Sequence, residues 1–177
     1  MTDYFALFDE ARRPWLDPEK LKEKYFARAR SAPAGTELNE AFRVLSDPKL
    51  RLHHLLVLEG VDLTAGRAVP AAVAELVWNT GTLLREIERW LVKSQEASST
   101  LARALLSGER VQLEARLEKR EGELTAIYER ELDKLCEIDA GTTRDVLPKL
   151  IEVHDSISYL TRLRDQAAEK RFALNAN

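Results

Sequence analysis

The segment LNEAFRVLSDP, residues 38–48, sets the helical pattern of this chain. Its apolar residues Leu38, Phe42 and Leu45 recur at helical spacing and predict a short amphipathic helix that ends just before Asp47. Asp47-Pro48 then predicts the start of another helix, because an Asp side chain accepts a free backbone N–H and a first-turn Pro has no N–H to leave unpaired. One Asp-Pro step therefore separates two consecutive helices.

The same step occurs earlier, at Asp17-Pro18, and Gly60 can take the left-handed conformation that ends a helix. These signals predict a module of four short helices, at about 4–8, 18–30, 37–45 and 48–58. We expect its core to hold the apolar side chains of these helices: Tyr4, Leu7, Leu21, Tyr25, Phe26, Leu38, Phe42, Leu45, Leu52, Leu55 and Leu56.

Beyond residues 61–69 (VDLTAGRAV), which interrupt the helical period, apolar residues recur in steps of four and three from Val73 to Leu105. This long helix can break at 97–100, and we expect Ser107-Gly108 to end it in either case. A second long helix is predicted from about 109 to 138.

The third long helix is predicted around Pro148, with Asp145 as its N-cap, and we expect the tail from Phe172 to fray. Short connections between such helices favour antiparallel neighbours. The predicted fold is therefore all-α, with a small helical module at 1–60, a linker at 61–69 and an elongated antiparallel three-helix bundle at 70–177.

Composition excludes several classes of partner. The net charge of −3 does not suggest a nucleic-acid-binding protein, and no stretch approaches the roughly 18 apolar residues of a membrane span. The N-terminus lacks a basic region followed by an apolar run, so no secretory signal is visible. Cys136 is the single cysteine, which excludes an intramolecular disulfide and favours the reducing cytoplasm.

The sequence offers no constellation for catalysis, a metal or a cofactor. His53 and His54 are adjacent, so on a helix they diverge by about 100°, and His154 is more typical of a bundle histidine than of a base. Nucleophile elbows, phosphate-binding loops and Cys-x-x-Cys spacings are absent from the sequence. We therefore expect a binding protein and not an enzyme.

Two features point to binding surfaces. The helix at 18–30 is locally basic, which is typical either of an ordinary solvated face or of a docking face for an acidic partner. Trp15, Trp78 and Trp90 can fill space between modules or anchor a partner. The basic residues are Lys20, Lys22, Lys24, Arg28 and Arg30.

The segments at 3–8, 21–26 and 38–48 together resemble a J domain, most specifically in the run Asn-x-Ala-Phe-x-x-Leu-x-Asp-Pro at 39–48. The continuation at 50–63 resembles the HscB-type J-protein co-chaperones of iron-sulfur cluster assembly. This resemblance covers residues 3 to 63 at the level of motifs and nearly the whole chain in architecture. It implies a J domain that binds a DnaK-type ATPase chaperone and a C-terminal bundle that binds an iron-sulfur scaffold protein.

In that family a His-Pro-Asp tripeptide beside the basic second helix couples docking to ATP hydrolysis. The corresponding residues here are Ala32, Pro33 and Ala34. Alanine supplies neither an imidazole nor a carboxylate, so the resemblance predicts chaperone docking without predicting ATPase stimulation. Client binding is expected early in the first long helix, at Ala74, Val77 and Trp78.

A hypothesis of a different class is also open. The J-like module can be a packing element only, in a structural helical adaptor whose long helices associate with a second copy or with another chain.

Overall fold

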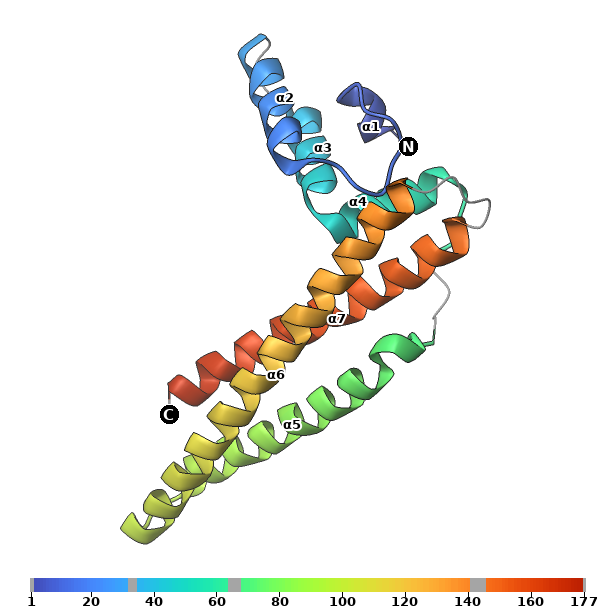
Figure 1. Cartoon of the computed structure of the whole chain (residues 1–177). Helices are drawn as coiled ribbons and strands as arrows, with labels where there is room; N and C mark the ends of the chain where they lie inside the picture. Colours follow the sequence, from blue (N-terminus) through green and yellow to red (C-terminus); the bar gives the residue numbers. More distant parts are fainter. Residues whose placement is uncertain (1, 32–34, 64–67, 141–145, 177) are drawn as a thin grey trace. The chain divides into compact units, whose positions relative to one another are not determined.

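The computed structural model describes residues 2–31, 35–63, 68–140 and 146–176. Within these ranges the chain is helical and contains no strand, which confirms the all-α prediction, and no helix is long and apolar enough to cross a membrane. The helices, shown in Figure 1, are α1 (Tyr4–Leu7), α2 (Pro18–Ser31), α3 (Thr36–Ser46), α4 (Pro48–Leu58), α5 (Ala71–Glu96), α6 (Thr100–Ala140) and α7 (Val146–Asn175).

Aspartate side chains begin the first, second and fourth helices. Asp17 Oδ1 accepts hydrogen bonds from the backbone N–H of Glu19 (3.0 Å) and Lys20 (3.3 Å) at the start of α2. Asp47 Oδ1 accepts one from Leu50 N (2.9 Å) at the start of α4. Both Asp-Pro starts predicted from the sequence are confirmed, as is Gly60, whose φ of 78° lies in the left-handed region just after α4.

The boundary between α5 and α6 settles an alternative and corrects a prediction. Helix α5 ends at Glu96. Ser99 Oγ then accepts the backbone N–H of Ala102 (3.1 Å) and caps the start of α6. The expectation that Ser107-Gly108 ends a helix is wrong, because Gly108 lies inside α6. A glycine inside a helix costs only about 1 kcal/mol relative to alanine, which the packing of a 41-residue helix outweighs.

The tail is also better ordered than expected. Helix α7 continues to Asn175, and Leu174 is fully buried against the second unit's core. Apolar burial therefore holds residues that the sequence alone predicts to fray. Asp145, the expected N-cap of this helix, lies outside the described residues.

The chain forms two compact units. One contains residues 1–68 with 131–155, and the other contains residues 69–130 with 156–177. Helices α6 and α7 thus contribute to both, so the division at 1–60, 61–69 and 70–177 stays a prediction.

In the first unit α1, α2 and α4 pack against α3. Its core differs from the predicted one around helix α1, where Phe5 and the C-cap residue Phe8 are fully buried and Tyr4 and Leu7 are only half-buried. Phe26, expected in the core, is 52 % exposed. The remaining buried apolar residues of the four short helices are Leu21, Ala41, Val44, Leu45, Leu52, Leu55 and Leu56.

In the second unit α5 packs with parts of α6 and α7 through two apolar clusters. The first includes Ile87, Trp90, Leu117 and Leu174, and the second includes Val73, Leu76, Leu124, Leu160 and Leu163. Ion pairs tie the same helices together outside the core, such as Glu86–Arg116 between α5 and α6 (2.6 Å, Oε2 to Nη1). The clusters use some of the predicted positions of the first long helix, such as Val73, Leu84 and Ile87. They also use Leu76, Leu83 and Trp90, which lie off the predicted steps of four and three, and Leu101 and Leu105 at the end of the predicted pattern are exposed.

Candidate partner-binding surfaces

Helix α2 is anchored along one side by aromatic and apolar contacts. Leu21 is buried, and the Tyr25 ring stacks on Phe42 of α3 with 4.3 Å between ring centroids. The Tyr25 hydroxyl donates to Asn39 Oδ1 (2.9 Å). The opposite side of α2 is left facing the solvent.

Two of the five predicted docking cations hold the turn that follows α1. Lys24 Nζ donates to the backbone carbonyls of Phe8 and Asp9 (3.3 Å each) and to Glu10 Oε1 (2.5 Å). Arg28 pairs with the Asp9 carboxylate, and its guanidinium lies 5.9 Å from the centroid of the Phe8 ring. Asp9 has a φ of 50°, in the region that L-residues rarely adopt. Lys24 and Arg28 therefore stabilise a strained turn, and each is already paired with a carboxylate.

The other three cations are exposed. Lys22 and Arg30 have no acidic partner among the described residues, and Lys20 Nζ lies 4.0 Å from Asp17 Oδ2. Lys22, Phe26 and Arg30 follow each other in steps of four, which places them on one face of α2. This face, which we call the α2 surface, combines two cations with an exposed aromatic ring. The predicted docking residues Ala32, Pro33 and Ala34 lie outside the described residues.

The predicted client-binding residues begin α5. Trp78 is 72 % exposed and Ala74, four residues earlier, is exposed beside it. Val77 is half-buried and packs against the apolar cluster of the second unit. Trp78 and Ala74 therefore form an exposed patch, whereas Val77 belongs to the packed side of α5. Of the other tryptophans, Trp90 fills the core.

The histidines have structural surroundings. His54 is 2 % exposed, accepts the N–H of Tyr4 at Nε2 (3.1 Å) and stacks on the rings of Tyr4 and Phe5. Burial lowers the pKa of His54, and burial together with the neighbouring His154 lowers the pKa of His53. In the described ranges no three His, Cys, Asp or Glu side chains come close enough to hold a metal ion.

Arg51 is a buried cation that the sequence analysis does not predict. It is only 5 % exposed, and its guanidinium donates from Nε to the carbonyl of Pro14 (2.9 Å) and from Nη1 to that of Leu45 (2.6 Å). It thus joins the loop before α2 to the end of α3. A charged residue inside a leucine-rich stretch (LRLHHLL) is a signal that could have indicated this role.

The described residues thus form an all-helical fold in which α2 exposes Phe26 and α5 exposes Trp78. No protein-family model and no curated protein sequence matches the chain. Among solved structures, the chain is similar to the chaperone HscB from Vibrio cholerae, with a TM-score of 0.62 and 16 % sequence identity. The alignment covers 98 % of this chain and 99 % of that one, so the two share a fold over their whole lengths.

Proposed function

We propose that this chain is a cytoplasmic co-chaperone-like protein that docks on a DnaK-type chaperone through the α2 surface and presents a client through the Trp78 patch. The observation that carries the proposal is the likeness of fold, over nearly the whole of both chains, to a protein described as a chaperone HscB. The J-like motifs at 3–63 support the same function independently.

The α2 surface supports docking on an acidic partner. Lys22 and Arg30 offer charges that no described residue neutralises. Phe26, which lies between them, is half exposed and offers an apolar contact to a partner. Charged rims steer association, whereas a buried aromatic ring supplies affinity. We expect Lys24 and Arg28 to contribute less, because their charges are engaged by the turn after α1.

Binding of a purified DnaK-type chaperone tests the docking step. Lys22→Glu with Arg30→Glu should weaken it about tenfold, equivalent to about 1.4 kcal/mol. Lys119→Glu with Arg162→Glu is the matched control, since both residues are exposed, lie on α6 and α7 and have no ion pair in the described structure. If the unaltered protein does not bind, or if both double variants lose equally, the docking proposal is wrong.

Stimulation of ATP hydrolysis is a separate matter. Because Ala32 and Ala34 bring no imidazole or carboxylate to the loop beside α2, we propose that docking occurs without marked stimulation. A steady-state ATPase assay over a range of protein concentrations should give rates close to those of the chaperone alone.

For the client, we propose an iron-sulfur scaffold protein that covers Trp78. Trp78→Ala should weaken capture of the scaffold about tenfold or more, as is usual for a central aromatic residue of an interface. Val92→Ala is the control, because Val92 is 54 % exposed on the same helix. Equal loss in both variants would argue against a specific patch.

A second candidate function is a self-associating helical adaptor. It is favoured by three apolar side chains of α6 that face solvent: Leu101 (72 % exposed), Leu105 (65 %) and Val111 (59 %). Exposed apolar residues close together on one helix commonly mark an interaction site. Light scattering across a wide concentration range distinguishes the candidates. A dimer that forms with the unaltered protein and not with the Leu101→Ser, Leu105→Ser double variant would favour the adaptor.

A further inference from the structure

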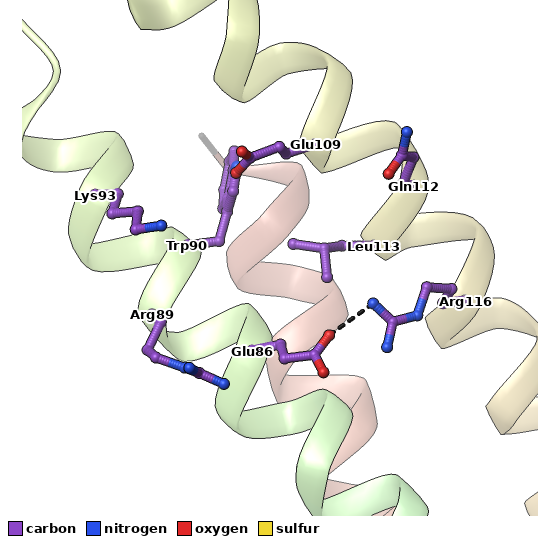
Figure 2. Close-up of a pocket in the computed structure, with 8 residues that line it drawn as sticks. All are labelled: Glu86, Arg89, Trp90, Lys93, Glu109, Gln112, Leu113 and Arg116. Carbon is purple, nitrogen blue, oxygen red and sulfur yellow. Dashed lines mark hydrogen bonds and ion pairs between the residues drawn. The ribbon is translucent and has the colours of Figure 1, made fainter.

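A groove between α5 and α6 lies outside both surfaces described above. Its volume is about 420 Å³, it opens to solvent, and all of its lining residues belong to the second unit. Figure 2 shows that side chains from both helices point into it, with Trp90 and Leu113 between the two walls.

The floor of the groove is apolar and fixed in place. Trp90 is 5 % exposed and Leu113 7 % exposed, and both side chains line the groove. The indole Nε1 of Trp90 donates to the carbonyl of Leu106 (3.1 Å), which holds the ring across the two helices. A preformed floor of this kind loses little conformational entropy when it is covered.

The α5 wall is positively charged. Arg89 and Lys93 lie four residues apart, are exposed, and have no acidic partner in the described part of the chain. Two of the α5 carboxylates near them are already engaged, whereas Glu96, three residues after Lys93, lies outside the groove lining and has no ion pair among the described residues. Glu86 pairs with Arg116 (2.6 Å, Oε2 to Nη1), and Glu88 with Lys170 of α7 (3.4 Å, Oε1 to Nζ).

The α6 wall carries charges of both signs. Arg116 is paired with Glu86 across the groove, as the dashed line in Figure 2 marks. Glu109 stands beside Trp90 and has no cation partner among the described residues. A ligand carboxylate is thus attracted to the α5 wall and repelled from the Trp90 end of the α6 wall.

We propose that this groove binds an acidic peptide segment, with an apolar side chain on Trp90 and Leu113 and two carboxylates against Arg89 and Lys93. Four residues of helix rise about 6 Å, so the two cations match acidic residues spaced i and i+4 on a partner helix. The proposal does not depend on chaperone docking or on Trp78, because it uses neither the α2 surface nor the Trp78 patch.

The test uses the full chain and a fluorescein-labelled synthetic peptide of about 12 residues, which spans about 18 Å as a helix. The peptide carries glutamates at i and i+4 beside a central leucine. A second peptide has lysines in place of the glutamates. Fluorescence anisotropy should show binding of the acidic peptide only, and added salt should weaken that binding.

Arg89→Glu with Lys93→Glu should weaken binding of the acidic peptide about tenfold or more, because two rim ion pairs worth up to about 1 kcal/mol each become repulsions. Lys119→Glu with Arg162→Glu makes the same change of charge outside the groove and should alter affinity less than about twofold. Glu109→Gln removes the repelling carboxylate and should tighten binding. If the Arg89/Lys93 variant fails to fold, tighter binding of the acidic peptide by Glu109→Gln supports the proposal and unchanged binding overturns it.

Three results would overturn the proposal: equal binding of the lysine peptide, equal loss in the control variant, or no binding of the acidic peptide at all. A second copy of the chain in the groove would also overturn it. That outcome would appear as a concentration-dependent dimer in sedimentation experiments, abolished by Arg89→Glu with Lys93→Glu.

Discussion

The two units of this protein are stabilised in different ways. In the first, polar side chains bind backbone groups far away in sequence, as Arg51 does with Pro14 and Lys24 with Phe8. In the second, periodic apolar side chains such as Ile87 and Leu117 form the core, and ion pairs link the helices around it. Short helices bury too little apolar surface to be stable alone, and these hydrogen bonds supplement the small apolar core of the first unit.

The largest effect is expected in the second unit. Ile87 is fully buried, and Ile87→Ala should lower the free energy of unfolding by about 4 kcal/mol through lost apolar burial and a residual cavity. Hydrogen exchange followed by mass spectrometry should show faster exchange in α5 than in α3. Equal acceleration in both helices would mean that the units unfold as one.

Arg51→Met tests how the first unit is stabilised. It leaves the carbonyls of Pro14 and Leu45 without these donors, at about 1 to 3 kcal/mol for each buried group. We expect a loss of about 3 kcal/mol, read by urea unfolding, with hydrogen exchange faster in α3 and α4 than in α5. Arg43→Met is the control, because Arg43 is exposed and pairs only locally with Glu40.

Gly108→Ala should stabilise the protein. An added Cβ at Gly108 meets no atom within 4 Å, so the change gains helix propensity without a clash. The expected gain is about 1 kcal/mol, visible as a higher melting temperature. Gly60→Ala is the contrasting variant: its φ of 78° disfavours a side chain, and we expect it to melt lower.

The smallest effect concerns pH. Because burial lowers the pKa of His54 in the folded protein, the unfolded chain binds a proton at higher pH than the folded one does. The contribution of neutral His54 is therefore present above about pH 6.5 and is lost progressively as the pH falls below that value.

Thermal melts between about pH 7.5 and 5 avoid most carboxylate titration. His54→Gln should melt lower than the unaltered protein at the upper end and should show a flatter pH profile. An unchanged slope would assign the pH dependence to other groups, of which His53 is the first to test.

The sequence predicted most of the fold because its signals are local. Asp17, Asp47 and Gly60 mark helix ends by their own side-chain chemistry, and the long seams repeat at helical spacing. The possible break at 97–100 is where α5 ends, but the helix end predicted at Ser107-Gly108 is wrong, since glycine is tolerated inside a helix that packs well.

The candidate surfaces were less predictable. The basic composition of α2 was evident, but not that Lys24 and Arg28 are held by the turn at Asp9. Trp78 and Trp90 look alike in sequence, yet one is open and the other fills the core. The groove cations Arg89 and Lys93 were not singled out, because their availability depends on which helices engage Glu86 and Glu88.

The discontinuity of the first unit has a consequence for synthesis. Arg13 Nε, near the N-terminus, donates to Asp139 Oδ1 (3.2 Å), and residues 131–155 belong to the same compact unit as the first 68. On the ribosome, the four short helices emerge well before the partners that complete their packing. At about 5 to 20 residues per second, that wait lasts roughly 5 to 20 s. During this time the nascent N-terminal module is accessible to proteases and to chaperones that bind nascent chains.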